Sequence, residues 1–324
     1  MKKYFSTFAA GFEKPVERFL REDISPKDIR AMSGAIAYET AAPPSEIQKI
    51  KYFKNSYLVV GEYSGAKDLE EVAAIPPPKI PVPARARSFK LLVLERNKLV
   101  AVSGGSKAKL VSLLERRTGL KYGASSADVE FLLTFRDDGN VFLLERVTKS
   151  PIETERGELE PHVANILVRA CRIAPGDIFI DPFAGSGAIP LARAAAGPYR
   201  GIFAMDIDAE NAKKLKARVS KIRNSRMQKS FFVKARDFLE NKFDGNFADV
   251  MATDPPWGEF QKIGADFYQR VFAEFARILK PGGCLILLVG REVRLPTEKD
   301  LIKNAEYDVL IHGKKAKVLT FAKV

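Results

Sequence analysis

Hydrophobic and polar positions follow two different patterns along this 324-residue chain, and the pattern changes near residue 151. Beyond that point, short apolar runs alternate with helical stretches, of which residues 209–222 and 266–279 are the clearest. The apolar runs lie at residues 178–180, 201–205, 231–233, 249–252 and 285–289. Strands that alternate with helices predict βαβ units and a mostly parallel, doubly wound sheet.

The last segment departs from this alternation. Residues 307–312 and 316–324 are two strand-like runs on either side of Gly313, Lys314 and Lys315, which predicts a terminal antiparallel hairpin. Such an ending is unusual for dinucleotide-binding domains.

The first 150 residues mix short strands and helices. A proline-rich stretch, Ile75–Pro83, cannot form a helix or a central strand, so an extended linker or edge segment is expected there. A β-hairpin is predicted where residues 129–135 and 141–145 flank the turn Arg136–Asn140. Other strands are expected at residues 34–38, 56–60 and 89–95, and helices near residues 14–21 and 107–117. Domain boundaries are therefore expected near residues 75 and 150.

Composition narrows the class of protein. Hydrophobic residues make up 46% of the chain, enough to bury sizeable cores, and no apolar run is long enough to predict a membrane span. Glu13, Lys14 and Pro15 interrupt the opening segment before a signal-peptide core could form, so a cytoplasmic location is expected.

The cysteines and histidines are few. Cys171 and Cys284 do not form a C-x-x-C pair, and together with His162 and His312 they make no metal-ligand cluster, so no metal is predicted. We interpret the cysteines as two buried thiols, with a disulfide as the alternative.

The net charge of +13 is spread along the chain: residues 1–150 carry 25 basic and 18 acidic residues (+7), and the remainder 28 and 22 (+6). An excess of this kind favours a polyanionic partner, because each neutralised phosphate releases counterions. A generally cationic soluble protein is the alternative.

The first chemical motif is Asp181-Pro-Phe-Ala-Gly-Ser-Gly187, between a buried strand and an alanine-rich helix. Its glycines allow the backbone to approach a ligand closely. A dinucleotide fingerprint would need Gly or Ala where Pro190 stands, and a P-loop would need Gly-Lys-Ser/Thr. The loop suits a ligand with a charged amino-acid end and no pyrophosphate, such as S-adenosylmethionine; a simple tight turn is the alternative.

Acidic residues follow the next two predicted strands. Asp206 is placed to accept the hydroxyls of a ribose, and Ile207 to lie against an adenine ring, whereas Asp208 could cap the helix that begins at Ala209. Asp237, followed by Phe238, could meet the adenine amine or cap a helix.

The second chemical motif is the most informative. Asp254-Pro255-Pro256-Trp257 follows the apolar run at residues 249–252. The amine of a base is a poor nucleophile because its lone pair is delocalised into the ring. Acceptors for both amine protons, here the Asp254 side chain and the Pro255 carbonyl, would direct that lone pair at a methyl group. Trp257, the only tryptophan, could stack on a flipped base; a turn with a buried tryptophan is the alternative.

These residues carry a resemblance to a known family. Asp181 to Gly187 together with Asp254 to Trp257 resembles the class I amino-methyltransferases, and their order along the chain is similar to that of the THUMP-containing RNA methyltransferases. The proline-rich segment, the hairpin near residues 129–145 and the stretch Arg156–Ala164 look like the passage into that family's catalytic domain. Tyrosine or phenylalanine is common in that family where this chain has Trp257. Tryptophan at this position of the motif is familiar from RNA adenine-N6 methyltransferases.

The resemblance implies an α/β fold in three parts. Residues 1–75 would form a ferredoxin-like domain, residues 76–150 a THUMP-like RNA-binding region, and residues 151–324 a Rossmann-like methyltransferase domain with a mixed seven-stranded sheet and a terminal antiparallel hairpin. Exposed phosphate contacts are expected, with a solvated helix face as the alternative, from Lys107, Lys109, Arg116, Arg117 and Lys121.

The resemblance also implies the function. We expect an S-adenosylmethionine-dependent enzyme that methylates the N2 amine of a guanosine in tRNA, acting as a monomer without an obligate protein partner or membrane. The target-amine site would comprise Asp254, Pro255, Pro256 and Trp257. The cofactor site would comprise Asp181, Ala184, Gly185, Gly187, Asp206, Ile207, Asp237 and Phe238.

Three other functions stay open. Methylation of adenine N6 in RNA or DNA would keep the chemistry. Methylation of a protein glutamine is disfavoured because that motif usually begins with Asn rather than Asp254. A catalytically silent RNA-binding protein is the alternative of another class, and the intact Asp181, Asp206 and Asp254 count against it.

Overall fold

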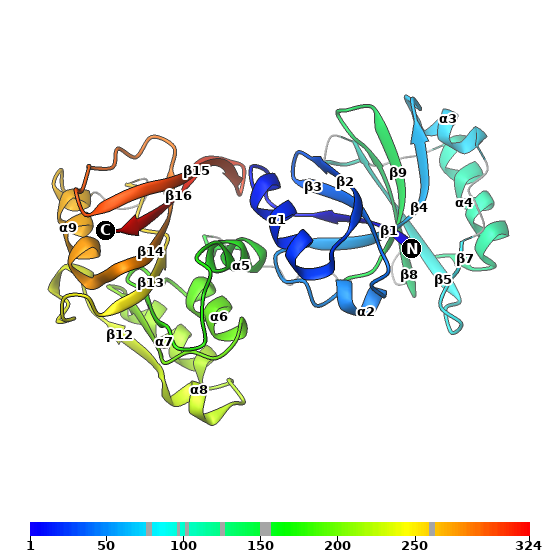
Figure 1. Cartoon of the computed structure of the whole chain (residues 1–324). Coiled ribbons are helices and arrows are strands. Elements are labelled where there is room, and N and C mark those ends of the chain that lie inside the picture. Colours follow the sequence, from blue (N-terminus) through cyan, green and yellow to red (C-terminus); the bar gives the residue numbers. More distant parts are fainter. Residues whose placement is uncertain (76–79, 96–97, 101–103, 124–126, 150–156, 259–262) are drawn as a thin grey trace. The chain divides into compact units, whose positions relative to one another are not determined.

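The computed structural model describes residues 1–75, 80–95, 98–100, 104–123, 127–149, 157–258 and 263–324. They form two compact units (Figure 1). The first comprises Met1–Thr7 and Leu20–Pro151, and the second comprises Phe8–Phe19 and Ile152–Val324.

The first unit is built on a nine-stranded sheet with the order β2-β3-β1-β4-β9-β8-β5-β6, and β7 pairs with β5. The predicted hairpin is confirmed, because Val129–Phe135 (β8) and Asn140–Arg146 (β9) pair antiparallel. The other strands are β1 (Lys2–Thr7), β2 (Lys27–Met32), β3 (Ala35–Thr40), β4 (Asn55–Ser64), β5 (Ser88–Glu95), β6 (Lys98–Leu99) and β7 (Lys121–Tyr122). The helices are α2 (Pro44–Ile47), α3 (Leu69–Ala74) and α4 (Gly105–Thr118), with part of α1 (Glu13–Ile24).

One core of this unit lies between the sheet and the helices α3 and α4. Leu110 and Leu114, one helical turn apart on α4, are fully buried and pack with the alternating inward residues of β5, such as Phe89. Helix α4 ends at Gly119, whose φ of +73° lies in the left-handed region that favours glycine. The three-part division of the chain stays a prediction: its boundary near residue 75 falls between α3 and β5, within or beside residues 76–79, and its boundary near residue 150 also lies outside the described residues.

The second unit has the predicted mixed sheet. Its seven strands have the order β12-β11-β10-β13-β14-β16-β15, and β16 runs antiparallel to both β14 and β15, while the other pairs are parallel. The strands are β10 (Ile178–Asp181), β11 (Gly201–Asp206), β12 (Phe231–Ala235), β13 (Ala248–Thr253), β14 (Leu279–Gly290), β15 (Leu301–Ile311) and β16 (Lys314–Lys323). The terminal antiparallel hairpin, β15 with β16, is confirmed, and so is the Rossmann-like fold class.

Helices cover both faces of this sheet (Figure 1). On one face α9 (Phe267–Ile278) buries residues three or four positions apart, among them Val271, Phe272 and Phe275, against β10, β13 and β14. The helices α5 (Pro161–Ala170), α6 (Ala188–Ala195) and α7 (Ala209–Val219) belong to the other face, and α8 (Ser225–Lys229) follows α7. The short 3₁₀ helix η1 (Phe238–Glu240) packs with α9 instead. Within the described ranges, no helix has the length and apolar character needed to cross a membrane.

The sheet reverses its order between β10 and β13. The chain builds outward from β10 through β11 to β12, and then returns to place β13 on the other side of β10. In doubly wound sheets, ligands bind outside the carboxyl ends of the strands at such a switch point. The loops after β10 and β13 flank this position, and both carry a motif singled out in the sequence.

The segment Phe8–Phe19 belongs to the second unit although it precedes most of the first unit in sequence. The Leu310 N–H on β15 donates a hydrogen bond of 3.0 Å to the Ala10 carbonyl. Gly11 lies so close to β15 that a Cβ atom would stand 2.0 Å from the Asp308 carbonyl oxygen, and its φ is +97°. Gly11 is therefore required both by space and by backbone conformation.

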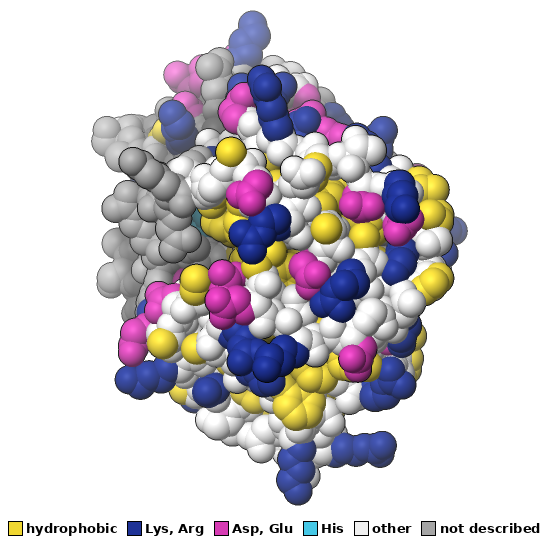
Figure 2. Space-filling model, turned by 90° about the vertical axis from the view of Figure 1, so that its left-hand side faces the viewer, with side chains coloured by type: hydrophobic (Ala, Val, Ile, Leu, Met, Phe, Trp, Pro, Cys, Tyr) yellow, Lys and Arg dark blue, Asp and Glu magenta, His cyan; other side chains and the backbone are white. Residues whose placement is uncertain are grey.

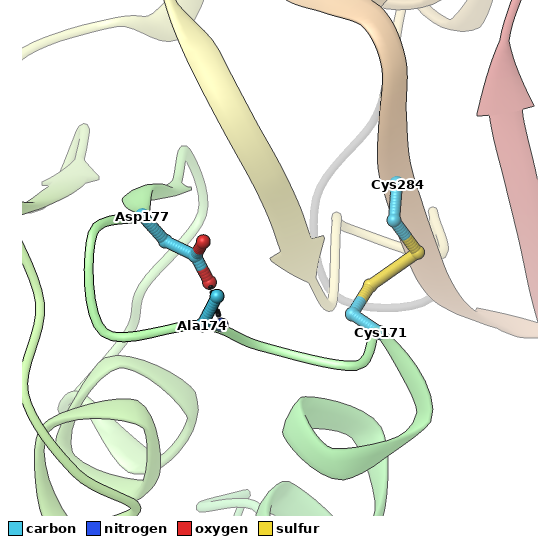
Figure 3. Close-up of a disulfide and its surroundings, with 4 residues drawn as sticks. All are labelled: Cys171, Ala174, Asp177 and Cys284. Atoms are coloured by element: carbon cyan, nitrogen blue, oxygen red, sulfur yellow. Dashed lines mark hydrogen bonds between the residues drawn. A yellow bond between two sulfur atoms is a disulfide. The ribbon is translucent and has the colours of Figure 1, made fainter.

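A disulfide joins Cys171, at the end of α5, to Cys284 on β14 (Figure 3). The Cα atoms are 5.9 Å apart, which is within the usual range for a bridge. The interpretation as two separate buried thiols is therefore wrong. The sequence could not show the pairing, because it depends on the loop after α5 lying against β14, 113 residues further along the chain.

Removing the bridge should destabilise the second unit. The bridge closes a long loop and so restricts the unfolded chain, and for the double variant Cys171→Ala/Cys284→Ala we expect the free energy of unfolding to fall by about 2–5 kcal/mol. Urea unfolding of the variant, and of the wild type with and without a reducing agent, measures this change. Identical unfolding midpoints in all three samples would contradict it.

Candidate active site

The carboxyl ends of four neighbouring strands bring the candidate residues together. Asp181 ends β10, Asp206 ends β11, Asp237 follows β12 and Asp254 follows β13. A cavity of about 630 Å³ opens at this side of the sheet. Pockets for small molecules and cofactors have volumes of this order.

The cavity gathers most of the predicted site. Its lining includes the predicted residues Ala184, Gly185, Asp206, Ile207, Asp237, Phe238, Asp254 and Pro256. Asp181, Gly187, Pro255 and Trp257 lie beside it without lining it. Among the described residues, no group of His, Cys, Asp and Glu side chains is arranged to hold a metal ion.

The glycine loop after β10 is held in place by β11. The Ala184 N–H donates to the Met205 carbonyl at 2.7 Å, and the Gly185 N–H donates to Asp206 Oδ2 at 2.8 Å. Gly187 has a φ of +100°, and a Cβ atom there would meet Leu215 Cδ1 of α7 at 2.2 Å. The second glycine thus allows α6 to begin close to α7, while the first part of the loop forms a wall of the cavity.

Asp206 organises the end of β11. Its Oδ1 accepts hydrogen bonds from the Asp208 N–H at 2.9 Å and from Asn211 Nδ2 at 3.3 Å, while Oδ2 accepts the bond from Gly185. The carboxylate is therefore oriented before any ligand arrives. The neighbouring Ile207 is 67% exposed at the cavity, an unusual position for a large aliphatic side chain.

Two further aspartates of this region act as helix caps. Asp208 accepts the Glu210 N–H at 2.8 Å and caps α7, which confirms that alternative. Asp237 accepts the Leu239 N–H at 2.9 Å and caps η1, yet it also lines the cavity. Phe238 is almost fully buried and meets Phe183 edge to face, with ring centroids 5.7 Å apart. Together they form a cavity wall of mixed apolar and acidic character.

Asp181 lies beneath the glycine loop. It is fully buried, and its Oδ1 accepts a hydrogen bond of 2.6 Å from the Thr253 hydroxyl of β13. Its Oδ2 is buried without a hydrogen-bond partner in the part of the chain that the structure describes. Burial raises the pKa of Asp181 to about 8, although the bonds from Thr253 and from the Phe183 N–H oppose the rise. Asp181 therefore links the two loops of the switch point rather than facing the cavity.

The backbone and side chains of the second motif are held at separate points. Trp257 Nε1 donates to Asp254 Oδ1 at 2.8 Å, and the Tyr268 hydroxyl of α9 donates to the Pro256 carbonyl at 2.9 Å. Among the residues that the structure describes, neither Asp254 Oδ2 nor the Pro255 carbonyl accepts a hydrogen bond. Burial raises the pKa of Asp254 to about 7, and the bond from Trp257 opposes that rise. The motif thus presents two uncommitted oxygen acceptors.

Sequence reasoning missed a clamp on the glycine loop. Arg218 of α7 donates to both the carbonyl and the hydroxyl of Ser186 at 3.1 Å, and it pairs with Glu158 at 2.8 Å. Glu158 also lines the cavity, as do Asn211 and Lys214 of α7 and Phe267 of α9. The position of Arg218 on the polar side of an amphipathic helix carries no signal in one sequence, because its partners lie 32 and 60 residues away.

Comparison with known proteins supplies the class of the second unit. Residues 152–308 match the family described as UPF0020, RMKL-like, methyltransferase domain. This region is therefore similar to the RMKL-like methyltransferase domains. The match covers the glycine loop, the acidic strand ends and the Asp-Pro-Pro-Trp motif, and it confirms the predicted class of enzyme, an S-adenosylmethionine-dependent methyltransferase.

A curated relative and two solved structures extend the comparison. The mouse (Mus musculus) U6 snRNA (guanine-N(2))-methyltransferase THUMPD2 is 23% identical over 195 residues, which are 59% of this chain and only 36% of that protein. TrmN from Thermus thermophilus superposes with a TM-score of 0.81 at 20% identity, over the full length of both chains. SMU.472, solved in complex with SAH, gives a TM-score of 0.73 at 14% identity, covering all of this chain and 98% of its own.

These similarities confirm the resemblance to THUMP-containing RNA methyltransferases that the motifs indicate. At such low identities the two solved structures establish the fold alone. The roles of the individual site residues around the methyltransferase domain's cavity stay predictions.

The buried carboxyl of Asp181 should make stability depend on pH. Its pKa in the folded state lies above its ordinary value of 3.8, so its favourable contribution is full below pH 3.8 and is lost as the pH rises through about 8. Asparagine at this position does not titrate. We expect the stability of Asp181→Asn relative to wild type to increase between pH 5 and pH 9 by at least about 1 kcal/mol.

Urea unfolding at both pH values measures this difference. Asp208→Asn, which removes an exposed cap carboxylate, controls for the loss of one negative charge. If the free energies of unfolding of wild type and Asp181→Asn change equally with pH, the pKa of Asp181 is not raised in the folded state.

Proposed function

We propose that the methyltransferase domain transfers a methyl group from S-adenosylmethionine to the exocyclic N2 amine of a guanosine in tRNA. One observation carries this proposal. Asp254 of the Asp-Pro-Pro-Trp motif lines the same cavity as the glycine loop and Asp206. Candidate groups for a cofactor and for a target amine therefore face one cavity.

The residues present suit the cofactor. Asp206 offers a preorganised carboxylate for the ribose hydroxyls, and Ile207 offers an exposed apolar surface for the adenine ring. The acidic side chains on the cavity wall are Glu158, Asp206, Asp208, Asp237 and Asp254, against Lys214 as the basic one. This balance favours a positively charged ligand and disfavours phosphate groups. When bound, S-adenosylmethionine would supply a methyl group whose carbon a nitrogen lone pair can attack, and the sulfur would leave as the neutral thioether of S-adenosylhomocysteine.

The motif suits the amine. Asp254 Oδ2 and the Pro255 carbonyl can each accept one amine proton, which directs the nitrogen lone pair away from both acceptors. The Tyr268 bond to Pro256 and the stiffness of two prolines hold these acceptors still, so little reorganisation is needed as the reaction proceeds. The proton that the nitrogen releases passes to the Asp254 carboxylate and then to solvent. Fixed geometry, rather than a strong base, is the main contribution of the protein.

A nucleic-acid partner is supported by the surface charge of the second unit. Exposed cations are concentrated on α7, α8, β12 and the turns between them: Lys213, Lys214, Lys216, Lys221, Arg223, Arg226, Lys229, Lys234 and Arg236. Figure 2 shows a face of the molecule on which charges of both signs are mixed, because Lys and Arg side chains are interspersed with Asp and Glu. A cationic edge beside an acidic cavity favours a polyanion whose backbone stays outside while one base enters.

The choice of guanosine N2 rests on THUMPD2, which is a U6 snRNA (guanine-N(2))-methyltransferase by name and is 23% identical over 195 residues. The choice of tRNA rests on the resemblance of the sequence motifs to the THUMP-containing RNA methyltransferases. Because one chain carries both a candidate RNA-binding region and the active site, the proposal includes a monomer. It also includes the cytoplasmic location that is expected from the sequence. Methylation of adenine N6 is the second candidate, favoured by Trp257 after Asp-Pro-Pro.

Methyl transfer to unmodified tRNA tests the chemistry. We expect the wild type to form N2-methylguanosine, and Asp254→Ala to lose at least about 100-fold in kcat while it keeps its affinity for S-adenosylhomocysteine. Because the carboxylate is the active form and its pKa is about 7, the rate should fall as the pH drops through 7. Labelled nucleosides separated after digestion provide the measurement.

Other products would decide between the candidates. N6-methyladenosine would overturn the base assignment and keep the mechanism. Cofactor binding without methyl transfer to any tRNA, other RNA or DNA would favour the catalytically silent protein.

The cationic edge should contribute to RNA affinity near the cavity. The strands are parallel and α7 runs back from their carboxyl ends, so Lys213, Lys234 and Arg236 lie toward the cavity, whereas Lys221, Arg226 and Lys229 lie toward the opposite end of the strands. We expect alanine at the first three positions to reduce the dependence of log Kd on log salt by about 2–3, since each lost phosphate contact removes about 0.7–0.9.

The matched control is alanine at the second three positions. Fluorescence anisotropy with labelled tRNA between 50 and 300 mM salt, a range over which about 6–10 phosphate contacts give a large effect, measures both variants. Equal slopes in the two variants would show that this edge gives only a general attraction.

A further inference from the structure

The indole of Trp257 is turned toward Asp254 and does not line the cavity. Its Nε1 donates a hydrogen bond of 2.8 Å to Asp254 Oδ1. The side chain is partly buried, and it is absent from the cavity wall that Asp254 and Pro256 help to form. The hydrogen bond directs the Nε1 edge of the ring at the Asp254 carboxylate.

The ring is seated against the end of β14. A Cβ atom added to Gly290 would stand 3.1 Å from Trp257 Cε3 and 3.3 Å from Cδ2, tighter than ordinary van der Waals contact. Gly290 is buried, and its missing side chain leaves the space that the indole occupies. Its backbone pairs with Ala316 of β16, so this support belongs to the rigid sheet.

We propose that Trp257 is a positioning residue that holds the Asp254 carboxylate by its indole N–H, with Gly290 as the seat that fixes the ring. The hydrogen bond occupies Oδ1 and leaves Oδ2 to accept from the target amine. The inference rests on the proposed function for its catalytic consequence, while the hydrogen bond itself can be measured without any substrate. Phenylalanine or tyrosine at this position would have no donor where the indole N–H lies, so the arrangement is specific to tryptophan.

The charge state of Asp254 depends on this bond. Burial and the Trp257 N–H act on its pKa, and the charge of Asp254 in turn raises the pKa of two neighbouring groups, Asp181 of β10 and Tyr268 of α9. Burial raises the pKa of Asp254 to about 7, and the Trp257 N–H is the contact that lowers it. Loss of that donor should raise the pKa further, by about one unit if the bond to the carboxylate is of ordinary strength.

A direct test uses the fact that the chain has one tryptophan. The full-length protein should give a single indole N–H cross-peak in a ¹H–¹⁵N spectrum, and we expect its proton shift to titrate with a midpoint near pH 7. Asp254→Asn should abolish this transition, whereas Asp181→Asn should leave its midpoint near pH 7, because Asp181, with a pKa of about 8, is still mostly neutral where Asp254 titrates. An indole peak that does not titrate, or that titrates equally in Asp254→Asn, would overturn the proposal whatever the protein methylates.

A kinetic test separates positioning from stacking. Trp257→Phe keeps an aromatic face and removes the donor, so we expect kcat to fall about fivefold at pH 7, to approach the wild-type value at pH 9, and KM to change little. Gly290→Ala, which pushes the ring by a few tenths of an ångström, should shift the pH profile in the same direction. Tyr199→Phe is the matched control: it removes another aromatic donor, bonded to the Met227 carbonyl, and should leave the profile unchanged.

The outcomes distinguish the two proposals. A wild type with no methyl transfer would contradict the proposed function and leave the NMR titration to decide the role of Trp257. An active wild type whose pH profile is unmoved by Trp257→Phe would overturn the positioning role. S-adenosylhomocysteine affinity and the unfolding midpoint of each variant report whether the cavity and the fold are intact.

Discussion

The hydrogen bond between Thr253 and Asp181 joins the two strands at which the sheet reverses its order. One strand leads into the glycine loop and the other into the Asp-Pro-Pro-Trp motif, so this buried contact sets the distance between the two halves of the site. It also holds a carboxyl group in a place where water cannot reach it. A fully buried carboxyl is costly for a folded protein. At this position, the buried carboxyl lowers the stability of the domain but fixes the two loops of the site relative to each other.

Around this contact, each loop of the site is held by a different part of the domain. Asp206 and Arg218 hold the glycine loop from β11 and α7, while Tyr268 holds the proline backbone from α9. Helices on both faces of the sheet therefore converge on one cavity. Among the described residues, Asp254 Oδ2 and the Pro255 carbonyl accept no hydrogen bond, whereas the groups around them are bonded. Within four residues of sequence, the motif thus contains both the acceptors proposed for the amine and the groups that hold them, such as the Pro256 carbonyl bonded by Tyr268.

Much of this could be predicted from the sequence, because hydrophobic alternation is a local signal. The order of strands and helices after residue 151, the terminal hairpin and the meeting of the acidic strand ends all follow from periodicity and from the geometry of parallel sheets. The direction of a side chain is not a local property. A stacking role for Trp257 is a prediction from its residue type alone, whereas the position of its ring also depends on the space that Gly290 leaves. The bridge between Cys171 and Cys284 and the clamp by Arg218 likewise depend on segments far apart in the chain.

The seating of Gly11 against β15 has a consequence for synthesis. The segment Phe8–Phe19 is translated long before its partners, Asp308 to Leu310. At about 5–20 residues per second, the delay between the two is on the order of 15–60 s. The fold of the second unit therefore cannot be completed until the hairpin of β15 and β16 has been synthesised and has bound a segment that left the ribosome much earlier.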